Sequence, residues 1–353
     1  MKYFSAFTGV GGFDLGMPSE WECVGMSEVD KYANMVLKYR FKDVKNYGDI
    51  EKINYEELPD FEVLLGGSPC QGVSIAGKRK GLAGLRSRLF FSYVAILKVK
   101  KPEYFIFENV KGLLSSNSGW DFAEVLNQFS EAGYDIWWQV LDASDFGIPQ
   151  HRERVFIIGT LGGKSRSKVF LEPKNSRSSS VLSGQSANTV TRRYRGSQAT
   201  ESYIVESELN AQRMSAVIQS KKQYARVYDS NGISPTLHRH TGGGQITKIA
   251  IPVLTPNREE KRQNGRRMKD DGEPAFTLTK QDRNGIYDGK MIRYLTPLEC
   301  ERLMGWPDNW TKYGIDDKGK VVELSDNQRY NLIGNGVVPQ IVRALIRLMW
   351  GSE

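Results

Sequence analysis

The sequence predicts an α/β fold with a doubly wound, mostly parallel sheet and a second, smaller domain. Three features of the chain lead to this prediction. Short apolar runs alternate with helical patterns through the first 160 residues. Residues 162–200 are instead rich in Ser, Gly, Arg and Lys and have no sustained periodicity. Regular patterning then returns at Tyr294.

The expected elements follow one another in a regular order. Strands are expected at 2–7, 21–27, 61–65, 103–107, 134–141 and 154–160. Helices are expected at 31–41, 89–98, 120–132 and 337–350, and the last of these should pack back on the first domain. Thr296-Pro297 followed by Glu299 is typical of a helix start, because Thr caps the first turn and Glu bonds back to it.

The composition is that of a soluble globular protein. The 353 residues are 39% hydrophobic and 25% charged, and no apolar run approaches the roughly 18 residues needed to cross a bilayer. Residues 1–4 lead straight into a strand, so we expect no targeting peptide. Three scattered cysteines and three histidines without a ligand pattern indicate a reducing compartment, no disulfide framework and no metal site.

Charge is distributed unevenly along the chain. Residues 160–290 contain 23 Lys and Arg against 12 Asp and Glu, whereas the rest contains 26 against 29. We therefore expect a near-neutral first domain of residues 1–165, completed by residues 320–353. A basic second domain of residues 166–319 would include a hinge. Its charge favours binding to a polyanion, above all nucleic acid, although a solvated basic face would have the same composition.

A weak unit recurs in the second domain around Thr189, Thr236 and Thr277. In each copy a Thr precedes a small apolar residue, basic or polar groups and a glycine. The copies are either ordinary strand-turn elements or loops that present side chains to a groove.

A glycine-rich turn, FTGVGGFDLG (7–16), directly follows the first expected strand. Its glycines permit a tight turn and close approach of the backbone to a ligand. Asp14 occupies the position where a dinucleotide fingerprint has glycine, which disfavours a nicotinamide cofactor. An S-adenosylmethionine site uses a glycine turn without a pyrophosphate seat, but a plain turn fits the motif equally well.

Two acids lie near this turn in the expected fold. Glu28 ends the second strand, where a carboxylate can accept hydrogen bonds from ribose hydroxyls. Asp49 could contact an adenine amino group. Each acid, taken alone, also fits a solvated surface position.

Cys70 is the cysteine best placed for chemistry. It follows the strand at 61–65 through Gly-Gly-Ser-Pro and precedes a basic, glycine-dotted stretch. Nearby cations favour the thiolate, which is the nucleophilic form of cysteine. Cys23 and Cys300 fit the alternative of an inert, buried thiol better.

Glu108 and two arginines supply further polar groups. Glu108 closes the strand at 103–107 and is either a helix cap or a site carboxylate. Strand alternation puts Gln150, Arg152 and Arg154 on one face, where paired arginines suit a substrate with fixed acceptors or phosphate. An edge-strand charge ladder is the alternative. Because ligands of open α/β sheets lie beyond the carboxyl ends of the strands, all these groups should meet at one rim.

Taken together, the motifs resemble those of the DNA (cytosine-5) methyltransferases in their bacterial and phage arrangement. The matching segments are FTGVGGFDLG, GGSPCQGVSIAGKRKGL, FENV, QHRERVFIIG, RYLTPLECERLMGWPDNW and GNGVVPQIV. The resemblance covers roughly residues 1–160 and 292–350. It implies a Rossmann-like, S-adenosylmethionine-dependent domain and a basic target-recognition domain, with double-stranded DNA between them.

The resemblance also implies a mechanism. The target cytosine leaves the helix stack at a cost of a few kcal/mol. Cys70 attacks C6, and C5 becomes the carbon nucleophile that takes the methyl group. Glu108 holds N3 and N4, while Arg154, with Arg152 nearby, binds O2 or a neighbouring phosphate. A base, which could be water, removes the C5 proton and Cys70 leaves. No metal takes part, and S-adenosylhomocysteine is the product.

The same matching assigns the remaining site residues. The methyl-donor site would be lined by Phe7, Gly9, Gly11, Gly12, Glu28, Val29, Asp49, Ile50, Leu89, Asn335 and Val337. DNA would be contacted by Gln71, Ser74, Lys78, Arg86, Thr236, Leu237 and Thr277. Residues 71–88 are expected to form a mobile lid over the DNA. Two departures from the family pattern are Val29, where many members have an aromatic residue, and Gly336, where Ser or Ala is frequent.

Other functions stay open at this stage. A tRNA cytosine-5 methyltransferase would share the chemistry, and a catalytically inactive DNA-binding protein or a nicotinamide-dependent oxidoreductase would share parts of the pattern. The preferred interpretation is a cytoplasmic, nucleoid-associated monomer that does not bind membranes. A cognate restriction endonuclease could be its functional rather than physical partner.

Overall fold

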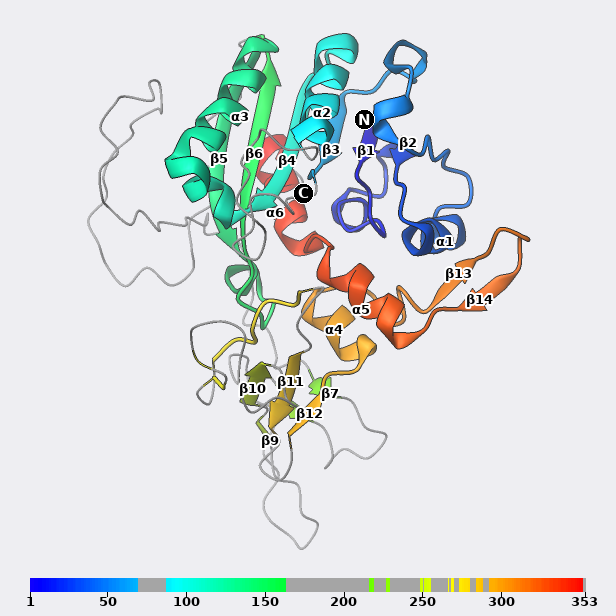
Figure 1. Cartoon of the computed structure of the whole chain (residues 1–353), viewed down its shortest axis with the longest axis vertical. Helices are drawn as coiled ribbons and strands as arrows, with labels where there is room; N and C mark the ends of the chain where they lie inside the picture. Colours follow the sequence, from blue (N-terminus) through cyan, green and yellow to red (C-terminus); the bar gives the residue numbers. More distant parts are fainter. Residues whose placement is uncertain are drawn as a thin grey trace, which may run out of the picture.

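The computed structural model (Figure 1) describes three long segments of the chain, 1–68, 87–162 and 292–351. Between the last two it describes short pieces only, at 216–218, 227–228, 248–249, 251–254, 266, 268–269, 273–279 and 284–287. Cys70 and residues 71–86 of the expected lid lie outside the described residues, whereas its last two residues begin helix α2. Most of the residues expected to contact DNA also lie outside the described residues.

A six-stranded sheet forms the centre of the first domain, with strand order β2-β1-β3-β4-β6-β5. Its strands are β1 (Lys2–Ala6), β2 (Glu22–Ser27), β3 (Val63–Gly66), β4 (Tyr104–Val110), β5 (Tyr134–Asp142) and β6 (Glu153–Leu161). The first four in sequence are parallel, and β6 pairs antiparallel with both β4 and β5. This topology confirms the predicted mostly parallel sheet.

Helices cover both faces of the sheet, as Figure 1 shows. They are α1 (Lys31–Arg40), α2 (Ser87–Lys100), α3 (Trp120–Glu131) and α6 (Pro339–Trp350). Successive strand residues enter different cores: Tyr104 and Ile106 pack with α1 and α6, whereas Phe105 and Phe107 pack with α2 and α3. Because side chains alternate along a strand, strands buried on both faces carry the continuous apolar runs seen in the sequence.

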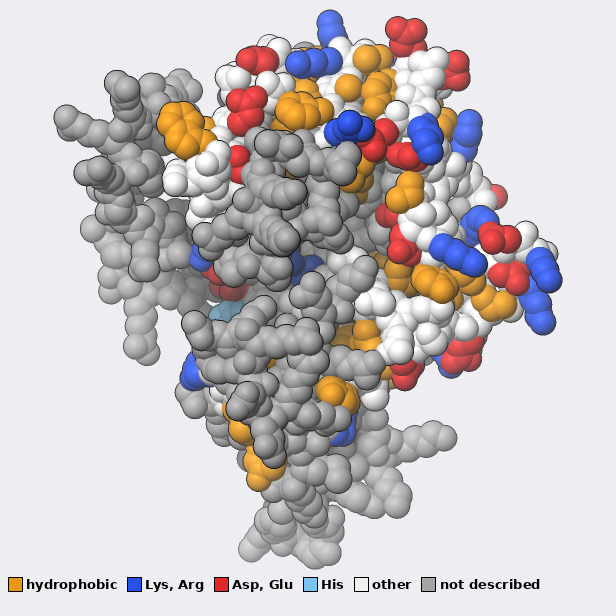
Figure 2. Space-filling view, viewed as in Figure 1, with side chains coloured by type: hydrophobic (Ala, Val, Ile, Leu, Met, Phe, Trp, Pro, Cys, Tyr) orange, Lys and Arg blue, Asp and Glu red, His pale blue; other side chains and the backbone are white. Residues whose placement is uncertain are grey.

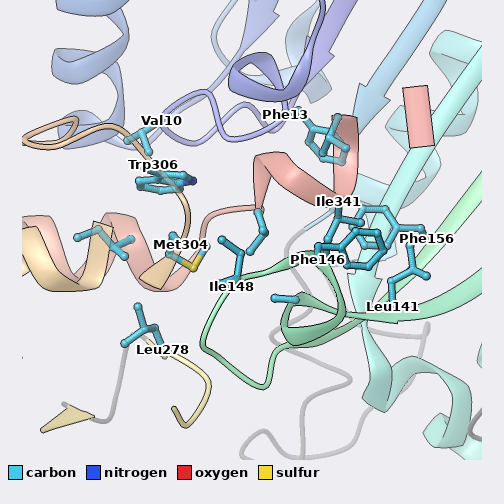
Figure 3. Packing of buried hydrophobic residues seen from close by; sticks show 14 of the residues in the cluster. Val10, Phe13, Leu141, Phe146, Ile148, Phe156, Leu278, Met304, Trp306 and Ile341 are labelled. Carbon is cyan, nitrogen blue, oxygen red and sulfur yellow. The ribbon is translucent and has the colours of Figure 1, made fainter. Parts of the chain in front are cut away.

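The C-terminal part returns to the first domain. It contains α4 (Pro297–Leu303), β13 (Tyr313–Ile315), β14 (Val321–Glu323) and α5 (Asp326–Gly334). Thr296 caps α4 in a full capping box with Glu299, as its sequence predicts. Leu295 and Trp306 belong to the buried cluster that contains Val10 and Phe13 (Figure 3). The division at residue 319 stays a prediction, but residues 295–306 already share the core of the first domain.

The short described pieces form small sheets in the second domain. One sheet contains β10 (Ile251–Leu254), β11 (Asn284–Tyr287) and β12 (Ile292–Tyr294), and the other contains β7 (Ala216–Ile218), β8 (Val227–Tyr228) and β9 (Lys248–Ile249). Figure 2 shows acidic and basic side chains interspersed over the described surface of the first domain. This mixture agrees with the near-neutral charge of that domain.

Within the described residues, one stretch, Asp326–Trp350, is long and apolar enough to cross a membrane by composition alone. It consists of two helices, α5 and α6, with Asn335 to Val338 between them. The apolar face of α6, including Ile341, Leu345 and Met349, is buried in the core. Packing in a globular core therefore accounts for its composition.

Candidate active site

The glycine-rich turn after β1 is built from backbone conformations that side chains disfavour. Phe7, Gly9 and Gly11 all have positive φ angles, of 52°, 59° and 84°. Gly12 approaches a second turn so closely that an added Cβ would lie 2.9 Å from the backbone nitrogen and oxygen of Val337. The two expected methyl-donor segments, at 7–12 and 334–338, are therefore in direct contact.

Glu28 ties the end of β2 to the same turn. One carboxylate oxygen accepts from the Gly9 amide at 2.7 Å, and the other accepts from the amides of Val29 and Asp30, both at 2.7 Å. Burial raises the pKa of Glu28 against these hydrogen bonds. The Val29 side chain is 67% exposed, so an apolar surface lies beside the carboxylate.

The remaining expected cofactor residues differ in how they could contribute. Asp49 caps a short 3-10 helix by accepting from Glu51 and lies 3.2 Å from the ammonium group of Lys52. The Ile50 side chain is buried in the core shared with α2, which differs from the expectation that it lines a site. Leu89 packs on the same core but is only partly buried. Asn335 is exposed at the end of α5.

The structure leaves no room for a side chain at Gly336. An added Cβ would lie 2.2 Å from Cζ2 of Trp306, because that indole ring fills the space beside the glycine. The large aromatic ring and the absent side chain therefore complement each other.

The end of β3 leads toward Cys70 along a path that passes Glu108. Gly66 pairs with Phe107, so the next residue, Gly67, lies beside Glu108. A Cβ on Gly67 would be 2.7 Å from the Glu108 carbonyl oxygen and 2.9 Å from its carboxylate. Only glycine permits this approach. Cys70 follows three positions later in the sequence.

Glu108 and Arg154 form a buried ion pair. Glu108 lies inside β4 rather than at its end, because pairing with β6 extends the strand to Val110. Arg154 faces Val110 across the two strands, which makes Glu108 its diagonal neighbour on the same face. Arg154 Nε lies 2.9 Å from a Glu108 carboxylate oxygen, and both side chains are at least four-fifths buried. Burial raises the pKa of Glu108 despite the two arginines nearby.

Arg152 lies on the predicted face, but its guanidinium is bound to the protein backbone. Its terminal nitrogens donate to the carbonyls of Leu278 at 2.9 Å, Gly336 at 2.6 Å and Gly334 at 3.3 Å. The side chain is almost fully buried. This differs from the expectation of two arginines presented to a substrate, and the reason is that these carbonyls compete for the same donors. Arg152 instead joins the sheet to both the second domain and the 334–338 turn.

The two cysteines that the structure describes are not activated. Cys300 is buried and Cys23 is partly buried. Burial raises the pKa of both thiols, and neighbouring acids add to the effect. This agrees with the prediction that both are inert, and leaves Cys70 as the candidate nucleophile. In the described part of the chain, no cluster of three His, Cys, Asp or Glu side chains could hold a metal ion.

The motif order and the mostly parallel sheet agree with comparison to known proteins. Residues 1–350 match the family model described as C-5 cytosine-specific DNA methylase. The chain belongs to this family.

Full-length relatives support this membership in the C-5 cytosine-specific DNA methylase family. The orphan methyltransferase M.SPRI of Bacillus phage SPR is 32% identical, and the alignment covers 98% of this chain and 97% of that protein. The type II methyltransferase M.BanI of Aneurinibacillus aneurinilyticus is 27% identical over 98% of this chain and 95% of its own. The predicted resemblance is confirmed, and the protein is a DNA (cytosine-5) methyltransferase by enzyme class.

Solved structures confirm the Rossmann-like fold of the chain. A prophage-encoded DNA modification methyltransferase from E. coli superposes with a TM-score of 0.60 at 19% identity, covering 99% of both chains. The S. pombe Dnmt2 methyltransferase gives 0.55 at 18% identity, covering 99% of this chain and 98% of its own.

The structure also reveals a junction between the domains of this methylase that the sequence did not indicate. Residues 273–279 run alongside 149–152, with His151 N donating to Ala275 O and Ala275 N donating to Pro149 O, both at 2.9 Å. The Thr277 hydroxyl donates to the His151 carbonyl, which differs from a side chain that faces DNA. Gln150, which is fully buried, binds Leu303 and Leu278. Pairing of two distant segments left no local signal of this role.

Proposed function

We propose that this protein methylates C5 of cytosine at specific sites in double-stranded DNA, with S-adenosylmethionine as donor, through base flipping and a covalent Cys70–C6 adduct. The observation that carries the proposal is the buried Glu108–Arg154 ion pair beside the strand that leads to Cys70. A paired carboxylate and guanidinium present an acceptor and donors in fixed positions, which match the polar edge of a cytosine ring.

In this proposal Glu108 and Arg154 hold the flipped base. The Glu108 carboxylate accepts from the exocyclic amine N4, and its raised pKa favours a proton shared with N3. Arg154 donates to O2. A proton on N3 draws electrons from the ring as the nucleophile adds, so the pair stabilises the charge that develops there. Arg152 stabilises the Glu108–Arg154 pair and does not itself touch the base.

Cys70 supplies the covalent step. Its thiolate adds to C6 and breaks the C5–C6 double bond, so that C5 becomes nucleophilic. After C5 is methylated, loss of the C5 proton to a base and release of the thiolate restore the ring. Gly67, packed against Glu108, keeps the start of this segment next to the pocket.

The residues around the glycine turn fit S-adenosylmethionine, which supplies an electrophilic methyl group. The Glu28 oxygen that accepts from Gly9 keeps a lone pair for a ribose hydroxyl, because it accepts one hydrogen bond within the protein while the other oxygen accepts two. The exposed Val29 offers apolar contact to adenine. The space beside Gly9 is open, because a Cβ added there would meet no atom within 4 Å. Asn335 and Val337 would complete the site from the adjoining turn.

The proposed setting is a cytoplasmic, nucleoid-associated monomer with double-stranded DNA as its partner. Relatives of this chain include proteins named as orphan and as type II methyltransferases. If the gene of a cognate restriction endonuclease accompanies this one, we propose that endonuclease as a functional partner.

The decisive experiment compares duplex DNA with tRNA transcript as methyl acceptors. We expect transfer of labelled methyl groups to DNA only, at C5 of cytosine by bisulfite sequencing, and trapping of the protein on DNA that contains 5-fluorocytosine. Cys70→Ala should abolish both, whereas Cys23→Ala should retain both. Transfer only to tRNA, or unchanged activity of Cys70→Ala, would refute the proposal.

A further inference from the structure

We propose that Trp306 and Trp310 are positioning residues that fix the two backbone turns of the methyl-donor site. This inference rests on the proposed function, because it concerns the turns expected to hold S-adenosylmethionine. Both tryptophans lie in one short segment, GWPDNW (305–310), directly after α4. Each indole donates its single hydrogen bond to a different turn.

Trp310 holds the glycine-rich turn. Its indole Nε1 donates to the carbonyl oxygen of Val10 at 2.8 Å. Val10 is buried, so water reaches its carbonyl poorly. Without the indole donor of Trp310 this carbonyl would be unpaired, and a buried unpaired carbonyl is unfavourable. Phe41 adds to this contact, because its ring packs on Trp310 and fills the space beside Gly11.

Arg40 fixes Trp310 from the other side. The guanidinium carbon lies 4.6 Å from the centre of the Trp310 ring, which is a cation–π geometry. The same guanidinium donates to the Trp310 carbonyl at 3.0 Å and to the Asn309 carbonyl at 2.6 Å. The Trp310 indole is therefore held from the side opposite the glycine turn by contacts that do not involve that turn.

Trp306 holds the second turn. Its indole Nε1 donates to the Val337 carbonyl at 2.9 Å, while its ring fills the space beside Gly336. Trp306 is buried within the cluster of Val10, Met304 and Ile341 shown in Figure 3. The position of the Trp306 ring is thus set by core packing, and its hydrogen bond in turn positions the backbone of residues 336–337.

The two turns also touch each other, since Gly12 packs against the backbone of Val337. One rigid segment thus supplies both donors and sets the spacing between the two turns. Neither indole contacts Glu108 or Arg154 through any hydrogen bond of the described residues. Removing either N–H should therefore weaken binding of the donor and leave the base pocket intact.

The test replaces each indole by a ring that cannot donate. We expect Trp306→Phe and Trp310→Phe each to raise the Kd for S-adenosylhomocysteine about threefold to tenfold in calorimetry, the range for loss of one hydrogen bond that acts indirectly. KM for S-adenosylmethionine should rise more than kcat falls, and the Kd for duplex DNA without cofactor should be unchanged. Trp120→Phe is the matched control, because Trp120 is 73% exposed.

A second pair of variants separates positioning from general loss of stability. Gly336→Ala should weaken binding of S-adenosylhomocysteine, because its methyl group displaces the Trp306 ring. The double variant Trp306→Phe/Gly336→Ala should bind it more tightly than Gly336→Ala alone, since the smaller ring makes room for the methyl group. A melting temperature near that of the parent, followed by fluorescence, confirms that each variant is folded.

The outcomes distinguish this inference from the proposed function. Failure of the unmodified protein to bind S-adenosylhomocysteine would refute the proposed donor site itself. Unmodified protein that binds, together with Phe variants of equal affinity, would overturn the positioning role alone. Variants that lose stability but keep the parent Kd would assign the indoles to the core and also overturn it.

Discussion

The proposed base pocket and the proposed methyl-donor rim are constructed in opposite ways. In the base pocket, the functional groups are side chains, Glu108 and Arg154, and the register of β4 against β6 places them. At the donor rim, the functional groups are largely backbone, in turns at 7–12 and 334–338. Indole and guanidinium groups that do not belong to either turn donate hydrogen bonds to the carbonyls of that backbone.

The difference has a consequence for how each region responds to substitution. A side-chain site loses its chemistry when one group is replaced, while the sheet that carries it stays folded. In a backbone site the binding atoms remain present after almost any substitution elsewhere. Their relative positions change, however, when a distant supporting residue is removed. Substitutions in the two regions should therefore separate catalysis from donor binding.

The largest effect is expected from Glu108→Gln. The amide keeps the size of the side chain but cannot share a proton with N3, so methyl transfer should fall about 10²-fold to 10⁴-fold. The Kd for S-adenosylhomocysteine should stay within twofold of the parent, because the donor rim is not altered. Single-turnover transfer to duplex DNA measures the first quantity and calorimetry the second.

Glu22→Gln is the control for this prediction, because Glu22 is exposed on β2, a strand that does not touch Glu108. It should leave both quantities unchanged. Equal losses of transfer and of donor binding in Glu108→Gln would show that the two regions are not separable.

The second prediction contrasts the two arginines. Arg152→Ala removes three hydrogen bonds to buried or partly buried carbonyls and should lower the free energy of unfolding by about 3–5 kcal/mol. Arg154→Ala leaves Glu108 buried without its partner, but a raised pKa lets that carboxyl become neutral, so the loss of stability should be smaller. Urea unfolding at pH 7 compares the two.

Activity should rank the arginines differently from stability. Arg154→Lys retains the charge but not the Nε contact, and should lower methyl transfer far more than donor binding. Arg152→Lys should weaken both together, because it loosens Gly334 and Gly336. The comparison would fail if Arg152→Lys lowered transfer while leaving donor binding and stability at the parent values.

Much of this arrangement could be predicted from the sequence, since local patterns specify it. The expected strands and helices agree with the structure to within a few residues, and the contact of Glu28 with Gly9 joins the ends of two neighbouring parallel strands, as expected. The main error in the sheet was to end β4 at Phe107. Pairing with β6 extends it to Val110, and pairing with a distant strand leaves no mark on the local pattern.

The supports of the donor rim could not be predicted, because their partners are far away in sequence. Arg152 binds carbonyls 126, 182 and 184 residues away. Strand alternation correctly predicts the face of the strand on which Arg152 lies, but it cannot predict which distant groups contact that face. Trp310 reaches Val10 across 300 residues. The lack of room for a side chain at Gly336 becomes evident only once Trp306 is placed beside it.

The third prediction tests the donor rim through its glycines. Gly12→Ala inserts a methyl group 2.9 Å from the Val337 backbone and should raise the Kd for S-adenosylhomocysteine at least tenfold, since backbone cannot yield cheaply. The methyl group of Gly9→Ala would meet no atom, but residue 9 has a φ of 59°, which is unfavourable for a side chain by about 1 kcal/mol. We therefore expect Gly9→Ala to raise the Kd less than Gly12→Ala does. Calorimetry compares them, and a larger effect at Gly9 would show that conformation, not contact between the turns, determines the site.

The smallest effect concerns Asp14, which lies under the glycine turn where a dinucleotide fingerprint has glycine. It is buried, accepts from Ser5 Oγ at 3.1 Å, and faces the Tyr3 hydroxyl and the Cys23 thiol. Burial raises the pKa of Asp14 to about 6. The pKa values of Tyr3 and Cys23 are also raised, so neither group ionises at neutral pH.

A raised folded-state pKa means that the native state holds the proton more tightly than the unfolded chain does. The stability from protonated Asp14 is therefore complete below about pH 4 and is lost as pH rises through 6, by up to about 3 kcal/mol. Asp14→Asn removes this dependence, so its free energy of unfolding should change less than the parent's between pH 4.5 and 7.5 in urea. Other acids with raised pKa values, Glu28, Glu108 and Asp145, titrate in both proteins and cancel in the difference. Parallel pH profiles for parent and variant would mean that Asp14 stays ionised beneath the donor rim, and that the turn above it tolerates a buried charge.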